Sequence, residues 1–205
     1  MLRLILLLAA SCLATAVSAY EQPAYAVIEE RGGFEIRRYA GYLVAETEVE
    51  GDFKAARNAA FRRLFAYIGG SNSGDERIEM TVPVTTASAG EKIAMTVPVT
   101  TGMGGGSTSM QFMVPSQYTL ENVPRPTDER VRIRAVDERV VAARRYSGRS
   151  NEENFRREEA ELLGLLAAAG LKPAGPPQMA VYNGPLTPWF MRRNEVLVPI
   201  EWVSR

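Results

Sequence analysis

The reactive side chains of this sequence are carboxylates, tyrosines, methionines, lysines and arginines, because its 205 residues include no histidine and a single cysteine, Cys12. This composition excludes histidine-dependent triads and dyads, zinc–histidine sites and imidazole acid–base chemistry. The favoured metal donors are carboxylate, Met, Tyr and backbone oxygens. A lysine nitrogen is costly to deprotonate, since its reference pKa is about 10.4. Acid–base catalysis would need a carboxylate such as Glu195 beside a tyrosine. Such a carboxylate would lie in a cleft and have a raised pKa.

The sequence MTVPVTT occurs twice, 15 positions apart, beginning at Met80 and at Met95. In an extended chain the methionine and the two valines share one face. Pro83 and Pro98 have no N–H for a central ladder, so each copy should lie at a sheet edge, at a bulge or partly outside the sheet. The pattern predicts a strand and its tandem copy. The two methionines are usually core residues that fill gaps, but thioether sulfur is also a soft metal ligand.

The first 19 residues resemble a cleaved export leader. Arg3 is followed by an apolar run, and small residues precede a cleavage point after Ala19. The alternative is a lipoprotein signal in which Cys12 carries the lipid. We favour cleavage after Ala19, which leaves residues 20–205 as one domain without cysteine, exported and periplasmic in a cell with two membranes.

Charge gives no indication of a polyanionic partner. The chain has 24 basic and 24 acidic residues without a polybasic run, so we expect no nucleic-acid partner. The apolar leader is too short to cross a bilayer, so we expect no membrane span. We expect a monomer.

Two segments are predicted as helices, 52–68 and 151–169. Asp52 is a plausible N-cap of the first, and Ser150 with Glu153 forms a capping box at the second. Apolar residues recur at helical spacing along the first helix: Phe53, Ala56, Ala60, Phe61, Leu64, Phe65 and Ile68. Amphipathic helices usually bury such a stripe in their own domain, so we expect Phe61 and Phe65 in the core rather than in a binding wall.

Strand patterns surround both helices. They are predicted at 34–38, 42–49, 78–84, 110–114, 131–136, 139–146, 179–182 and 195–200. The order is two strands, a helix and two strands, and then the same again, with a proline-rich linker at 115–130. We therefore predict an α+β domain in which duplicated ββαββ-type halves form a distorted antiparallel β-barrel flanked by two α-helices.

Several motifs together resemble the SOUL heme-binding family. They are YIGGSN at 67–72, the MTVPV strand, YSG at 146–148, and YNGP at 182–185 followed by RRNEV at 192–196. The resemblance covers about residues 25–202. It implies a barrel of two similar halves, the fold of bacterial effector-binding domains. It also implies that heme or a related tetrapyrrole binds in an apolar cleft beside the first helix. The second MTVPV copy departs from the family pattern.

The resemblance also implies a set of binding residues. The family's heme-facing positions align with Asn58, Phe61, Leu64, Phe65 and Ala66. A related animal protein has an arginine, a methionine and a lysine where this chain has Asn58, Phe61 and Ala66, so the apolar wall is retained without those basic groups. The expected heme-binding residues are Asn58, Phe61, Arg62, Leu64, Phe65, Met80 and Met95.

Other basic and metal-binding candidates remain open. Arg57, Arg62 and Arg63 either form a solvated face or pair with the two propionates, which suit arginine by geometry. The iron ligand is undetermined. The candidates are the methionines, the tyrosines Tyr67, Tyr118, Tyr146 and Tyr182, another oxygen donor and a lysine nitrogen, and binding without any protein ligand is also open.

The leading hypothesis is a non-enzymatic tetrapyrrole binder that sequesters or carries heme. One alternative is a small-molecule hydrolase on the effector-binding scaffold that uses Glu195. Another is a protein-interaction module without a small ligand, which a closed cleft would favour. Arg192, Arg193 and Glu195 have a simpler structural interpretation, as a charged turn whose side chains form ion pairs.

Overall fold

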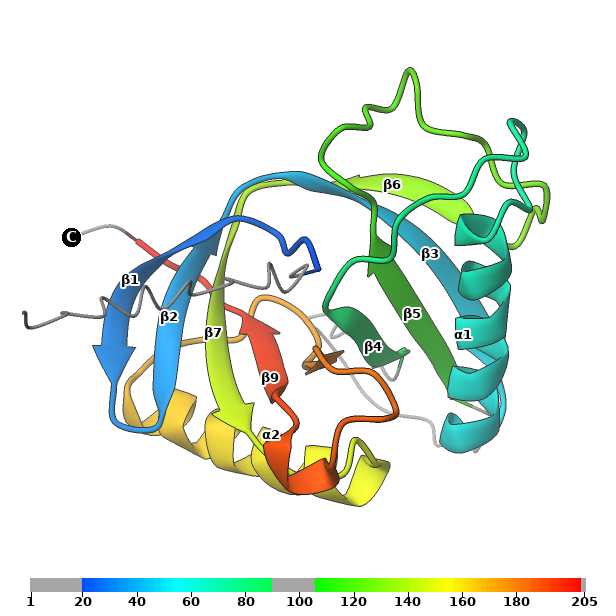
Figure 1. Cartoon of the computed structure of the whole chain (residues 1–205). Coiled ribbons are helices and arrows are strands. Elements are labelled where there is room, and N and C mark those ends of the chain that lie inside the picture. The colour runs from blue at the N-terminus through cyan, green and yellow to red at the C-terminus, as the bar shows by residue number, and fades with distance from the viewer. Residues whose placement is uncertain (1–19, 90–105, 204–205) are drawn as a thin grey trace, which may run out of the picture.

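The computed structural model describes residues 20–89 and 106–203. Within these residues it contains one nine-stranded sheet and two α-helices (Figure 1). The strands are β1 (Tyr25–Arg31), β2 (Phe34–Tyr39), β3 (Tyr42–Glu50), β4 (Val84–Ala89), β5 (Ser107–Met113), β6 (Arg132–Val136), β7 (Arg139–Tyr146), β8 (Gln178–Val181) and β9 (Asn194–Pro199). The helices are α1 (Phe53–Ile68), α2 (Glu152–Ala168) and the short 3-10 helix η1 (Trp189–Met191). Cys12 and Met95 lie outside the described residues.

The sheet is antiparallel throughout, with the strand order β1-β2-β7-β9-β8-β4-β5-β3-β6. This order is symmetric about the β8–β4 pair, because β8-β9-β7 on one side corresponds to β4-β5-β3 on the other. Helix α2 packs on β7 and β9 as α1 packs on β3 and β5. The sheet curls between the two helices (Figure 1). The predicted α+β fold with two similar halves is confirmed.

The two halves exchange their first strands. β2 pairs with β7 of the second half, and β6 pairs with β3 of the first. Asp137 and Glu138, which separate β6 from β7, therefore do not close a hairpin, because β6 and β7 are not neighbours in the sheet. Each half supplies a strand that pairs with the other half, so neither half forms its part of the sheet from its own strands alone.

Local caps fix the helix ends. The Asp52 carboxylate accepts a hydrogen bond from the Ala55 N–H at 3.1 Å, so the predicted N-cap of α1 is confirmed. The predicted Ser150 cap of α2 is wrong. Asn151 is the N-cap and accepts from the Asn154 N–H, whereas the Ser150 hydroxyl donates to the Asn194 side chain at 2.8 Å. Asparagine is as favourable an N-cap residue as serine, and the two residues are adjacent at positions 150 and 151.

One strand prediction is wrong, and one strand was missed. The strand expected at 78–84 begins only at Val84, and residues 78–83 lie outside it, because Pro83 has no N–H for a ladder. The edge strand β1 was not predicted. It pairs with β2 through a turn in which Gly33 has φ +98°, a conformation that favours glycine. Most residues of β1 are exposed, so its sequence lacks a buried face with clear alternation.

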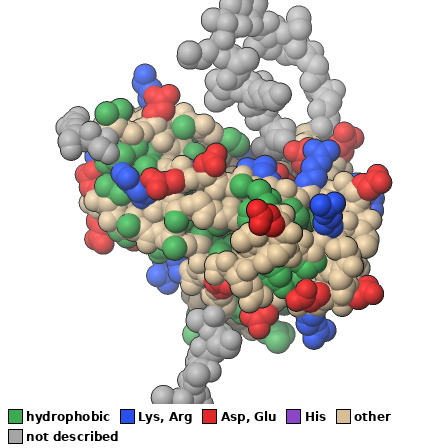
Figure 2. Space-filling model, turned by 90° about the horizontal axis from the view of Figure 1, so that it is seen from above, with side chains coloured by type: hydrophobic (Ala, Val, Ile, Leu, Met, Phe, Trp, Pro, Cys, Tyr) green, Lys and Arg blue, Asp and Glu red, His purple; other side chains and the backbone are tan. Residues whose placement is uncertain are grey.

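The core has a cluster under each helix, and a third cluster consists mainly of residues on or next to β2, β7, β8 and β9. The cluster beneath α1 includes Leu64, Tyr67 and Phe112, and the cluster beneath α2 includes Phe155, Leu162 and Val196. On the face of the molecule in Figure 2, acidic and basic side chains are interspersed among small apolar patches. Among the described residues, neither helix has the length and apolar character required to cross a membrane.

Candidate functional site

A cavity of about 620 Å³ lies beside α1, where the two halves of the sheet meet at β4 and β8. Its apolar wall combines residues of α1, of the first MTVPVTT copy and of both central strands. The lining residues are Tyr20, Arg57, Phe61, Phe65, Met80, Val82, Val84, Met110, Ser150, Val181, Tyr182, Asn183, Gly184, Pro185 and Arg192. We call this cavity the cleft.

Phe61 and Phe65 line the cleft and do not belong to the core, contrary to the expectation from helix periodicity. Their side chains are 37% and 53% exposed. The two rings stack with centroids 5.9 Å apart, and Phe61 also meets the edge of Phe112 at 5.4 Å. Helix α1 instead packs through Ala56, Ala60, Leu64 and Tyr67. The apolar stripe of α1 is thus wider than the face that packs on the sheet, and the surplus aromatic pair forms one wall of the cleft.

The other predicted residues divide between the cleft, its surroundings and the core. Met80 lines the cleft. Leu64 is fully buried in the core and does not reach it, because it lies on the packed face of α1. Asn58 lines a neighbouring hollow of about 650 Å³ between the N-terminal ends of the helices. Arg62 is exposed on the outer face of α1 and lines neither cavity. Met95 lies outside the described residues.

Arg57, for which the sequence left open a solvated face or pairing with a propionate, lines the cleft. It is half-buried, lines both the cleft and the neighbouring hollow, and donates to the backbone carbonyl of Ser150 at 2.6 Å. No carboxylate in residues 20–89 or 106–203 forms an ion pair with it. Burial lowers the pKa of Arg57, while interaction with Tyr146 opposes this. The guanidinium stays charged, so this end of the cleft carries an uncompensated cation.

Tyr146 places an unsatisfied polar group near this cation. Its hydroxyl is buried and has no hydrogen-bond partner among the described residues. Burial raises the pKa of Tyr146 to about 12, so the phenol remains protonated and able to donate. A buried donor without a partner costs free energy, but Tyr146 does not line the cleft, so this group is not offered to a ligand there.

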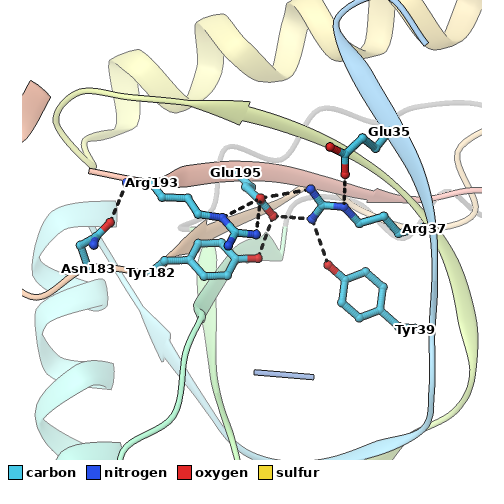
Figure 3. Close-up of polar contacts among 7 residues, drawn as sticks. All are labelled: Glu35, Arg37, Tyr39, Tyr182, Asn183, Arg193 and Glu195. Atoms are coloured by element: carbon cyan, nitrogen blue, oxygen red, sulfur yellow. Dashed lines mark hydrogen bonds and ion pairs between the residues drawn. The ribbon is translucent and has the colours of Figure 1, made fainter. Parts of the chain in front are cut away.

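Glu195 forms the centre of a buried ion-pair cluster (Figure 3). Its carboxylate is fully buried and accepts from both terminal nitrogens of Arg37, at 2.7 and 3.2 Å. Arg193 donates from the opposite side at 2.8 and 3.0 Å, and the Tyr182 hydroxyl donates at 2.7 Å. The Arg193 guanidinium also stacks over the Tyr182 ring, 4.0 Å from its centroid.

The cluster holds the cleft wall in place. Burial would raise the pKa of Glu195, but the bonds from Arg37 and Tyr182 more than offset burial, so its pKa lies below the ordinary value. Burial and the neighbouring Glu195 raise the pKa of Tyr182. The expected ion pair between Arg193 and Glu195 is confirmed. Glu195 does not line the cleft and lacks the raised pKa that would mark a general acid.

The turn between β8 and β9 is also held by polar contacts. Arg192 donates to the backbone carbonyls of Thr187 and Pro185 at 2.8 and 2.9 Å. The Asn183 side chain accepts from the Arg193 N–H at 2.6 Å. These bonds explain why YNGP and RRNE occur together in the sequence, since they shape one end of the cleft. Sequence patterns alone did not assign Tyr20, Val181 or Arg192 to this site.

Possible metal donors in the cleft are few. Met80 contributes a thioether, Tyr20 a phenol, and Tyr182 a phenol that is already bonded to Glu195. Tyr67 donates to the Pro124 carbonyl at 2.8 Å and lies outside the cleft, as do Tyr118 and Tyr146. Across the described chain, no three His, Cys, Asp or Glu residues cluster in a way that would hold a metal ion.

Solved structures share the fold. The C-terminal domain of EcmrR superimposes with a TM-score of 0.61 at 10% identity, covering 83% of this chain and 98% of that one. A hydrolase from Listeria innocua gives 0.53 at 10% identity, covering 85% and 94%. At these identities the likeness shows the fold alone.

Sequence comparisons are more specific. Heme-binding protein 1 of Xenopus tropicalis is 29% identical over 164 residues, which cover 80% of this chain and 81% of that protein. Human heme-binding protein 2 is 26% identical over 160 residues, covering 76% and 74%. The model of the SOUL heme-binding protein family matches residues 20–199, nearly all of the described chain. The protein is a member of the SOUL heme-binding protein family.

Proposed function

We propose that this protein binds heme or a related tetrapyrrole in the cleft beside α1, and sequesters or carries it without catalysis. The observation that carries the proposal is the exposed Phe61–Phe65 pair beside an arginine that lacks a carboxylate partner among the described residues. A cavity of about 620 Å³ falls within the range of about 300–1,000 Å³ typical of ligand sites.

The chemistry of the cleft fits a tetrapyrrole that bears carboxylates. The stacked phenylalanines and the valines of β4 and β8 offer an apolar surface for the macrocycle. Arg57 offers a positive charge for a propionate, and arginine binds carboxylates through bidentate hydrogen bonds. Burial of the macrocycle would supply most of the affinity, at about 25 cal/mol per Å² of apolar surface.

We further propose that the protein acts in the periplasm after cleavage of its leader behind Ala19. The leader pattern supports export, and the short apolar run disfavours the lipoprotein alternative at Cys12. The interaction-module hypothesis depended on a closed cleft, and the open cavity beside α1 favours a ligand instead. The hydrolase hypothesis relied on Glu195, whose buried, doubly paired carboxylate favours a structural role.

The experiment is a titration of the mature protein with hemin, followed by absorbance and calorimetry. Arg57→Met should weaken hemin binding roughly tenfold, the value of one charge-assisted hydrogen bond of about 1.5 kcal/mol. Arg62→Met is the matched control, because it removes the same charge from the same helix, outside the cleft.

The dimethyl ester of the porphyrin should bind wild-type protein and Arg57→Met equally, because it has no carboxylate to pair. Saturable binding of hemin supports the proposal. Absence of binding to a folded protein would overturn it. An equal loss of hemin affinity in Arg57→Met and Arg62→Met would show that Arg57 has no specific role in the binding site.

A further inference from the structure

The first described residue, Tyr20, lies in the cleft. It lines the same cavity as Phe61, Phe65 and Met80, and it is 58% exposed. The residue after it is anchored, since the Glu21 carbonyl accepts from the Val82 N–H at 3.0 Å and the Glu21 carboxylate accepts from the Ser116 N–H at 2.9 Å. Tyr20 is therefore held at the cleft by a neighbour that binds the protein at two points.

The side chains of the cleft provide very few donors for iron. No histidine or lysine belongs to its lining among the described residues, and Lys54 lies in the neighbouring hollow. The oxygens of Tyr182 and Asn183 are bonded to Glu195 and to the Arg193 N–H. Met110 also lines the cleft but is almost fully buried in the core. The Met80 thioether and the groups of Tyr20 remain.

Cleavage behind Ala19 would give Tyr20 a nitrogen donor that the precursor lacks. In the precursor this nitrogen is an amide, which is a poor metal ligand. In the mature chain it is a free α-amino group, with a reference pKa of about 7.7–8.0 against about 10.4 for lysine. At neutral pH about a tenth of such amines are already unprotonated, compared with fewer than one lysine in about a thousand.

We propose that the α-amino group of Tyr20 is an axial ligand of the iron when the mature protein binds heme. The proposal rests on the proposed function and adds a specific ligand to it. Coordination uses the lone pair of the amine, releases one proton to solvent and involves no change in oxidation state. It follows that the ligand is created by export, so the uncleaved precursor cannot coordinate iron in this way.

The test uses protein secreted through its own leader, with an intact mass that confirms Tyr20 as the first residue. Cells are grown with ¹⁵N-tyrosine, hemin is added, and pulsed electron paramagnetic resonance measures ¹⁵N hyperfine coupling to the ferric iron. In a second protein, Ala-Glu-Gly-Ser is inserted between Ala19 and Tyr20. The insertion moves the amino terminus up to about 13 Å along the chain while preserving every cleft side chain. Tyr20→Phe is the matched control, because it removes the phenol but retains the amine.

We expect strong ¹⁵N coupling in the mature protein and its loss in the extended protein. We also expect Tyr20→Phe to retain the absorbance spectrum of wild type. Hemin binding without ¹⁵N coupling, or a spectrum lost in Tyr20→Phe but retained in the extended protein, would overturn the amine ligand and leave the proposed function standing. Absence of hemin binding in all three folded proteins would instead overturn the proposed function.

Discussion

Replacing Phe65 with alanine should weaken hemin binding while leaving the fold nearly intact. Its side chain is 53% exposed and lines the cleft. A fully buried aromatic covers about 150–250 Å², so about 100 Å² of this residue is free to contact a ligand. At about 25 cal/mol per Å², half to full coverage of that area corresponds to about 1.3–2.5 kcal/mol. The dissociation constant should rise roughly 10- to 70-fold.

The assay is an absorbance titration with hemin, accompanied by thermal unfolding. Leu120→Ala is the matched control, because Leu120 is similarly exposed, at 60%, but does not line the cleft. Leu64→Ala is the opposite case. This residue is fully buried one position earlier in α1, and its truncation should cost about 2–5 kcal/mol of stability.

A folded Phe65→Ala protein that binds hemin as tightly as wild type does would refute a ligand site at Phe65. The ligand would then lie elsewhere, and the exposed aromatic pair would need another explanation. An equal loss of hemin affinity in Leu120→Ala and Phe65→Ala would also refute it, because the loss would then not be specific to the cleft.

Three further predictions concern the ion-pair cluster, the repeat and the leader. Glu195→Gln should lower stability by about 3–5 kcal/mol, because it leaves buried arginines unpaired. Since folding lowers the pKa of Glu195, its contribution is complete above the unfolded value of about 4.3 and is lost as pH falls through the folded pKa. Urea unfolding at pH 7 and at pH 3 should show a pH dependence that Glu195→Gln reduces. Deleting residues 90–104 joins β4 to β5 through Gly105-Gly106, a two-residue hairpin turn, so cooperative thermal unfolding should persist, and its loss would show that the second repeat is structural. The intact mass of the protein isolated from the periplasm should correspond to a chain that begins at Tyr20. A diacylglycerol on Cys12 would contradict the cleavage prediction.

Local sequence patterns determined most of the elements. The helical spacing of apolar residues and the Asp52 cap located α1 within one residue at its start, because both signals act over one or two turns. The alternation of apolar residues located most strands for the same reason. The absence of histidine likewise limits the possible chemistry through composition alone, wherever the remaining residues lie in the fold.

The tertiary structure decided which of these residues meet. Arg37 and Glu195 are separated by 158 positions, and only the exchange of β2 into the second half brings them together. The same long-range topology leaves Phe61 and Phe65 uncovered, because the sheet accommodates only the Ala56–Leu64 face of α1. A helix pattern records how many apolar residues share a side. It does not record how wide a surface the rest of the chain provides to cover them, since that surface is assembled from strands far away in the sequence.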